Sequence, residues 1–205
     1  MDNSRKISFF DGIADKWDGW EDLDEVRRNL TEGLKELGLA PDEAVLDVGC
    51  GTGNLTGALL ELLSPSSRVF AVDYSPRMVE MARRKIQDPR VTWHACDVTD
   101  LPLADGSLDR IVCFSVWPHF DDAEAVLRKF MALLRPGGWL HVWHLASRDK
   151  INDIHANAGE AVAGDILIPA AELAQLITDA GFDPTQTLDD ESRYLVTARK
   201  GEASA

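Results

Sequence analysis

Short apolar runs alternate along this chain with segments of helical periodicity. Five of the runs are rich in valine, isoleucine and aromatic residues: 44–48, 68–72, 91–96, 108–114 and 139–145. Several hold apolar residues at consecutive positions, which is typical of strands covered on both faces. A further run, at residues 193–198, alternates between apolar and polar positions. We predict five buried strands and a closing strand that lies antiparallel at or near the sheet edge.

Between these runs, apolar residues recur at intervals of three and four, the spacing of amphipathic helices. The predicted helices are residues 23–37, 54–63, 76–87, 122–134, 151–162 and 170–180. Gly38 and Gly181 stand where such helices end, and Ser75 followed by Pro76 is a typical helix start. The Arg-Pro-Gly-Gly sequence at 135–138 predicts a turn before the fifth strand. The alternation indicates an α/β fold: a doubly wound sheet, mostly parallel, with helices on both faces.

Charge narrows the classes of partner. The chain has 205 residues, and its 35 acidic and 21 basic side chains leave a formal net charge of −14. A surface this acidic repels polyphosphates, and the longest basic run, Arg83-Arg84-Lys85, fits the solvated face of a helix. We therefore expect no nucleic-acid partner. The length suits one globular domain with a sizeable core.

The cysteines and the apolar runs bear on compartment. Cys50, Cys96 and Cys113 are widely spaced, and without a C-x-x-C pairing they suggest neither a zinc site nor a redox motif. Free thiols indicate a reducing compartment. No stretch approaches the roughly 20 apolar residues that span a bilayer. We expect a cytoplasmic protein without a membrane partner.

The segment with the clearest chemistry follows the first predicted strand. Residues 45–55 read Val-Leu-Asp-Val-Gly-Cys-Gly-Thr-Gly-Asn-Leu, so a strand leads through three glycines into a helix. This arrangement brings backbone close to a ligand at the carboxyl edge of a sheet. The dinucleotide fingerprint G-x-G-x-x-G fails in both registers, because Asn54 or Thr56 stands in the final position. No Gly-Lys-Ser or Gly-Lys-Thr follows, so a phosphate loop is also excluded.

An acidic residue stands on each side of this glycine loop. Asp47 lies two residues before Gly49, and Asp73 ends the next strand, 20 residues after Gly53. A carboxylate at the end of the second strand of a doubly wound fold can accept hydrogen bonds from both hydroxyls of a ribose. The pattern predicts a nucleoside-containing cofactor.

At these residues the chain resembles the class I S-adenosylmethionine-dependent methyltransferases, with a methyltransferase type 11 pattern over roughly residues 42–200. The resemblance implies a Rossmann-like sheet and S-adenosylmethionine as cofactor. Asp47 to Gly53 match the first family motif, Asp73 the ribose-binding acid, and Asp97 the acid near the adenine amino group. The cofactor-binding residues implied are Asp47, Gly49, Cys50, Gly51, Gly53, Asp73, Tyr74, Met78, Asp97, Val98 and Phe114.

Structural roles compete with some of these assignments. Asp47 fits a charge satisfied by loop amides, and Asp97 fits a turn cap. For Cys50, a buried thiol that fills space is the favoured interpretation. His94 and His141 lie within predicted strands and are interpreted as core or sheet-face residues.

On the acceptor side, three histidines lie beyond the carboxyl ends of the later strands. His119 follows the fourth strand, His144 ends the fifth, and His155 lies in the segment that comes next. Imidazoles that converge there can supply a base, and we predict these three as the catalytic residues. A metal site shared by the three is the less favoured alternative, and no metal is expected.

The resemblance also divides the single domain that we predict over residues 1–205. Residues 1–40 form a helical cap or lid, 42–148 the cofactor-binding core, 149–168 a helical insertion at the acceptor pocket, and 169–200 the C-terminal helix and closing strands. Aromatic residues of the lid exclude water from the reaction. Ordinary packing of a cap helix is the alternative for Phe9, Phe10, Trp17 and Trp20.

The sequence therefore predicts methyl transfer from S-adenosylmethionine to a small-molecule acceptor by direct in-line displacement. A catalytically inactive cofactor-binding sensor or scaffold would show the same motifs. A nicotinamide-dependent oxidoreductase is disfavoured because the dinucleotide fingerprint fails. The acceptor, the atom methylated and the choice between monomer and homodimer stay open.

Overall fold

The structure is a computed structural model that describes residues 4–202. The first three residues of the expected cap lie outside the described part. The chain forms two units that divide between Leu101 and Pro102, and each is described by itself. The prediction of one domain over the whole chain stays a prediction.

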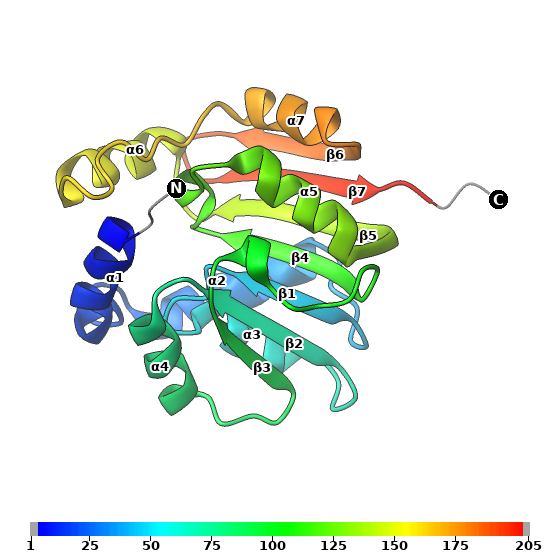
Figure 1. Ribbon diagram of the computed structural model, residues 1–205, viewed down its shortest axis with the longest axis horizontal. Coiled ribbons are helices and arrows are strands. Elements are labelled where there is room, and N and C mark those ends of the chain that lie inside the picture. The colour runs from blue at the N-terminus through cyan, green and yellow to red at the C-terminus, as the bar shows by residue number, and fades with distance from the viewer. Residues whose placement is uncertain (1–3, 203–205) are drawn as a thin grey trace. The chain divides into compact units, whose positions relative to one another are not determined.

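The first unit holds a parallel sheet in the order β3-β2-β1 (Figure 1). Its elements are α1 (Ser4–Trp17), α2 (Leu23–Glu36), β1 (Ala44–Val48), α3 (Asn54–Leu62), β2 (Arg68–Asp73), α4 (Pro76–Lys85), β3 (Val91–Ala95) and a 3-10 turn, η1 (Val98–Asp100). The helices α3 and α4 connect parallel strands and pack on them, while α1 packs on α4. Leu30, Leu46 and Leu59, from α2, β1 and α3, are fully buried. The sheet thereby brings the carboxyl ends of β1 and β2 together at one edge.

The second unit continues the alternation and ends in an antiparallel arrangement. Its elements are β4 (Leu108–Phe114), η2 (Trp117–His119), α5 (Ala123–Leu133), β5 (Leu134–His144), α6 (Arg148–Ala158), α7 (Ala170–Asp179), β6 (Phe182–Asp189) and β7 (Tyr194–Lys200). β4 and β5 are parallel, whereas β7 runs antiparallel to both β5 and β6. The expected α/β class, mostly parallel with an antiparallel strand near the edge, is confirmed.

Two boundaries differ from the prediction. β5 begins at Leu134, immediately after α5, because Leu134 already pairs with Leu108. The Arg-Pro-Gly-Gly turn therefore lies within the strand bounds, where the β4–β5 register shifts and Gly137 takes a φ of 73°. The expected helix at residues 151–162 begins earlier, at Arg148, and ends at Ala158 before Gly159.

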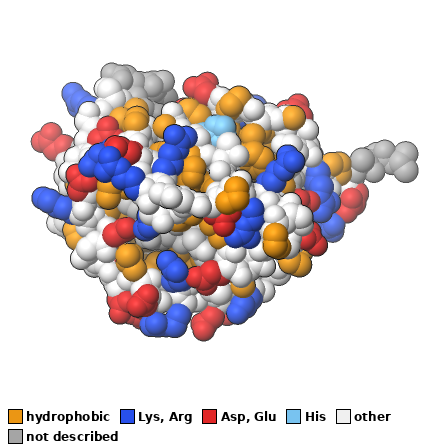
Figure 2. Space-filling view, turned by 90° about the horizontal axis from the view of Figure 1, so that it is seen from below, with side chains coloured by type: hydrophobic (Ala, Val, Ile, Leu, Met, Phe, Trp, Pro, Cys, Tyr) orange, Lys and Arg blue, Asp and Glu red, His pale blue; other side chains and the backbone are white. Residues whose placement is uncertain are grey.

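Charges on the surface are mixed in sign. Figure 2 shows a face on which acidic and basic side chains are interspersed. Arg83, Arg84 and Lys85 are exposed in the last turn of α4, and Arg84 pairs with Glu80 one turn earlier. The predicted solvated face is therefore confirmed. Within residues 4–202, no helix has the length and apolar character needed to cross a membrane.

Candidate functional site

The glycine loop between β1 and α3 depends on left-handed backbone. Gly49, Gly51 and Gly53 have φ angles of 67°, 51° and 88°, a region that favours glycine. The amides of Gly49 and Cys50 both donate to the Val72 carbonyl, at 2.8 and 3.0 Å, which ties the loop to the end of β2. A Cβ on Gly53 would lie 3.0 Å from Cδ1 of Ile86. The loop therefore keeps its backbone open on one side and packed on the other.

Asp73, at the carboxyl end of β2, is held against this loop. Its Oδ2 accepts a hydrogen bond from the Gly51 amide at 3.0 Å, and its Oδ1 accepts one from the Ser75 amide at 2.8 Å. The carboxylate thus joins the glycine loop to the start of α4. This is the edge where ligands of doubly wound folds bind.

Asp47 is a second carboxyl group at the same edge and is 1% exposed. Its Oδ2 accepts a hydrogen bond from the Thr56 hydroxyl at 2.5 Å. Burial, together with the nearby charge of Asp73, raises the pKa of Asp47 to about 7. A cation bound beside these two carboxyl groups would relieve that penalty. The pair therefore fits a positively charged ligand.

Cys50 lies within the loop but faces the protein interior. It is 6% exposed and belongs to an apolar cluster with Ala71 and Val79. Burial raises the pKa of its thiol well above the ordinary value, and Asp47 and Asp73 add to the effect. These surroundings favour the space-filling role.

The remaining predicted cofactor residues occupy both units. Tyr74 packs edge-on against Phe10 with ring centroids 5.9 Å apart, and Met78 is buried in α4. Asp97 caps η1, because its Oδ1 accepts hydrogen bonds from the Thr99 amide and hydroxyl at 2.9 and 2.7 Å. Next to it, Val98 is buried. In the second unit, Phe114 ends β4 and packs against Trp143.

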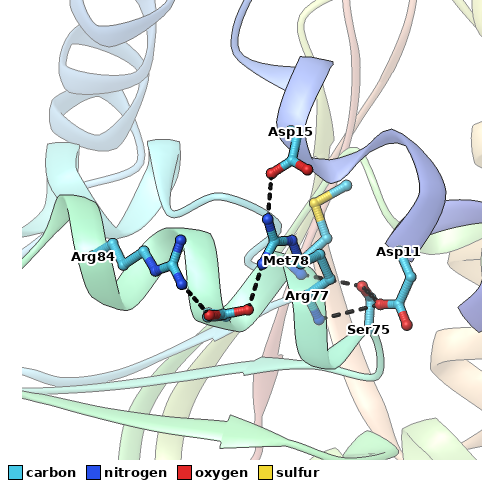
Figure 3. Close-up of polar contacts among 7 residues, drawn as sticks. Asp11, Asp15, Ser75, Arg77, Met78 and Arg84 are labelled. Carbon is cyan, nitrogen blue, oxygen red and sulfur yellow. Dashed lines mark hydrogen bonds and ion pairs between the residues drawn. The ribbon is translucent and has the colours of Figure 1, made fainter.

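The helix α1 is fastened to α4 by acidic side chains. Asp11 accepts hydrogen bonds from the Ser75 hydroxyl at 2.5 Å and from the Arg77 amide at 3.1 Å (Figure 3). Asp15 forms an ion pair with Arg77 at 2.7 Å. Residues four apart share one face of a helix, so this face of α1 covers the start of α4.

The end of α1 reaches the glycine loop itself. Asp18 accepts a hydrogen bond from the Thr52 hydroxyl at 2.5 Å and pairs with Lys85 at 2.8 Å. Nε1 of Trp17 is the nearest atom to the position of a Cβ on Gly51, at 3.9 Å. Sequence reasoning treated these acids only as part of an acidic cap. The four-residue spacing of Asp11 and Asp15 was the signal that they act together.

In the second unit, His119 and His155 are brought together by Asp165. The Nδ1 atom of His119 lies 2.7 Å from Oδ2 of Asp165. The Nδ1 atom of His155 donates to the Asp165 carbonyl at 2.6 Å, and the two imidazole rings are 4.8 Å apart. The sequence gave no means of pairing Asp165 with a histidine 46 residues away.

His144 lies close to the other two histidines but has different surroundings. It is 1% exposed, and neither ring nitrogen has a hydrogen-bond partner within residues 4–202. Burial and the neighbouring His119 and His155 lower the pKa of His144 to about 3, so its ring is neutral at physiological pH. Its ring meets Tyr194 edge-on at 5.7 Å. Tyr194 is fully buried, and burial raises its pKa.

The other two histidines lie in strands, as predicted. His141 of β5 is fully buried, lies 3.0 Å from the Thr197 hydroxyl and contacts Arg110. His94 of β3 is partly buried. Burial lowers the pKa of both rings. Among the described residues, no group of three or more His, Cys, Asp or Glu side chains is arranged to hold a metal ion.

Comparison with known proteins places these features in a family. Residues 45–138 match the family described as a methyltransferase domain. The chain is 37% identical over 186 residues to a 37.1 kDa protein in transposon TN4556 of Streptomyces fradiae, covering 86% of this chain and 52% of that protein. It is 36% identical over 145 residues to the ubiquinone biosynthesis O-methyltransferase of Xanthomonas campestris pv. campestris, covering 66% of this chain and 58% of that enzyme. The chain thus spans little more than half the length of these relatives.

A solved structure shows the same fold. A SAM-dependent methyltransferase from Aquifex aeolicus superposes with a TM-score of 0.70 at 20% identity, covering 87% of this chain and 98% of that one. The Rossmann-like fold expected from the sequence is thereby confirmed. The strand–glycine-loop–helix, the two acids beside it and these likenesses agree, and the chain belongs to the class I S-adenosylmethionine-dependent methyltransferases.

Proposed function

We propose that this protein transfers a methyl group from S-adenosylmethionine to a small-molecule acceptor by in-line displacement. The observation that carries the proposal is the buried Asp47 beside Asp73 at the glycine loop. S-adenosylmethionine carries a net positive charge, and a cation is the ligand that this carboxyl pair favours. When bound, the cofactor supplies an electrophilic methyl group on a sulfonium.

The residues of the first unit divide the work of holding this cofactor. The glycines Gly49, Gly51 and Gly53 leave room for close approach of the ligand to the backbone. Asp73 accepts hydrogen bonds from the ribose hydroxyls. Because the reaction is a direct displacement, positioning is the main catalytic resource, and well-oriented groups reach effective molarities of about 10⁵ M or more.

Replacing Asp73 with alanine tests the ribose assignment. The variant loses a charged acceptor of two hydrogen bonds, so affinity for S-adenosylmethionine should fall by about 1.5–3 kcal/mol, roughly 10- to 150-fold. Binding calorimetry measures the change. Asp42→Ala is the matched control, because Asp42 precedes the amino end of β1 and bonds to Ser64 and Ser66. Equal affinity in wild type and Asp73→Ala would refute the assignment.

An oxygen atom is the acceptor that the relatives favour. The Xanthomonas enzyme is named as an O-methyltransferase and is similar to this chain over 145 residues. The three histidines of the second unit provide bases, which a hydroxyl acceptor needs and an acceptor without a proton does not. A base is worth about 10² to 10⁴ in rate.

Transfer of a labelled methyl group tests the proposed function. The protein is incubated with methyl-labelled S-adenosylmethionine and a panel of phenols, aliphatic alcohols, amines, thiols and carbon acids, and labelled products are identified by mass spectrometry. We expect transfer to at least one small molecule of the panel. Binding of S-adenosylmethionine without any transfer would support the sensor or scaffold alternative instead.

A further inference from the structure

The contact between His119 and Asp165 decides where the proton of the imidazole lies. Nδ1 of His119 is 2.7 Å from Oδ2 of Asp165, and both side chains are about nine-tenths buried, at 10% and 9% exposed. An ionised carboxylate only accepts hydrogen bonds, so Nδ1 of His119 donates. A neutral His119 therefore carries its lone pair on Nε2, the nitrogen that acts as a base.

The backbone fixes His119 at the end of β4. Ser115, directly after the strand, takes a left-handed φ of 52°, which is uncommon for a residue other than glycine. Its amide donates to the Trp143 carbonyl at 2.9 Å and so ties the turn to β5. The next residues form η2, where the His119 amide donates to the Val116 carbonyl. Such strained backbone persists only when its surroundings hold it.

The loop that carries Asp165 is held just as firmly. The side chain of Asn152, on α6, both donates to the Leu167 carbonyl at 3.1 Å and accepts from the Leu167 amide at 2.7 Å. His155, one turn along α6, donates to the Asp165 carbonyl. Val162 and Leu167 anchor the loop on either side of Asp165 because both are buried. The carboxylate is therefore presented to His119 by a defined structure.

Neither of the other histidines has an equivalent partner. The Nδ1 atom of His155 faces a backbone carbonyl, which offers no full charge to stabilise an imidazolium. His144 is buried, and its neighbours among the described residues include two further imidazoles. Of the three, His119 alone has a printed contact with a carboxylate. A carboxylate behind a histidine holds the ring and its tautomer in place and stabilises the cation that forms.

We propose that His119 is the general base of the methyl transfer, that Asp165 is its positioning residue, and that the acceptor is therefore a hydroxyl group. This inference rests on the proposed function. The acceptor hydroxyl gives its proton to Nε2 of His119, and the oxygen electron pair forms a new C–O bond to the methyl carbon. The C–S bond breaks with its electron pair going to sulfur, which becomes a neutral thioether. The proton then leaves His119 for water.

Nitrogen NMR of the wild-type protein tests the pair without any turnover. In protein labelled with ¹⁵N at histidine, the ring of His119 should show a protonated Nδ1 and an unprotonated Nε2 at neutral pH. Asp165→Asn should change this pattern, whereas Asp153→Asn, the same substitution at an exposed position on α6, should leave it intact. A proton on Nε2 of wild-type His119 would overturn the proposal.

Kinetics with acceptors of graded acidity tests the role in catalysis. Phenols of increasing acidity, from phenol to 4-nitrophenol, are compared in wild type, Asp165→Asn and Asp153→Asn. With the least acidic phenol, Asp165→Asn should lower kcat by about 10²-fold or more. The loss should shrink as the acceptor becomes more acidic, because an acceptor that is already ionised needs no base. Asp165→Glu should recover part of the rate.

The outcomes separate this inference from the proposed function. A uniform loss across all phenols would show that Asp165 is only structural and would overturn its role. Transfer to amines, thiols or carbon acids but to no hydroxyl would overturn the acceptor class while leaving methyl transfer intact. No binding of S-adenosylmethionine, measured separately by calorimetry, would contradict the proposed function itself.

Discussion

Asp47→Asn should make the unliganded protein more stable at pH 8 and lower its affinity for S-adenosylmethionine by about 100-fold or more. The pKa of Asp47 is raised from its ordinary value of 3.8 to about 7 in the folded protein, mainly by burial. Between these two values the folded state holds a proton that the unfolded state has lost. Stability therefore falls as the pH rises from about 4 to about 7.

The size of this effect follows from the shift. Each pKa unit corresponds to about 1.4 kcal/mol, so the full cost of ionising Asp47 above pH 7 is on the order of 4 kcal/mol. Asparagine is neutral at every pH and keeps an oxygen that accepts from Thr56. Urea unfolding at pH 5 and pH 8 should show an advantage of Asp47→Asn that grows with pH. A variant that is less stable than wild type at pH 8 would contradict the account.

Cofactor binding should depend on pH in the opposite sense. A cationic ligand favours the ionised Asp47, so affinity of the wild type for S-adenosylmethionine should rise between pH 6 and pH 8. Asp47→Asn should lose this dependence together with most of the affinity. Titrations by calorimetry at several pH values test both points. A pH dependence that persists unchanged in the variant would assign it to another group.

The second large effect is expected from removing residues 1–20. This deletion takes away Asp18, which bonds to Thr52 in the glycine loop, and Trp17, which lies nearest Gly51. Water would then reach the loop, and we expect turnover to fall by at least about 100-fold with the core still folded. Circular dichroism and the labelled methyl assay measure the two properties. Unchanged turnover would refute the lid role.

A point variant separates the lid from simple loss of mass. Asp11→Ala with Asp15→Ala releases α1 from Ser75 and Arg77 while keeping its aromatic residues (Figure 3). We expect reduced turnover that worsens with added salt, because the ion pair of Asp15 is exposed to solvent screening. Asp24→Ala, at an exposed position in the first turn of α2, is the control and should leave turnover unchanged.

The sequence predicted those features whose signal is local. β1 and β4 have the bounds that were expected, since short apolar runs between turns identify buried strands. The glycine loop was found because its backbone needs glycine at three alternate positions. Each signal lies within a few residues of the feature it predicts.

Features that depend on distant contacts were less predictable. The interior positions of β6 are mostly exposed and polar, and Pro184 interrupts the run, so this edge strand shows little apolar pattern. The early start of β5 depends on pairing between Leu134 and Leu108. His119 was expected in the acceptor site, but its partner Asp165 lies 46 residues away in a loop. No periodicity connects two such residues.

Calorimetric titration of the 205-residue protein with S-adenosylmethionine and with NAD tests the central claim most directly. We predict one S-adenosylmethionine bound per chain, with affinity that falls in Asp73→Ala and in Asp47→Asn, and no binding of NAD. Binding of NAD, or S-adenosylmethionine binding that neither substitution changes, would contradict the assignment of this site.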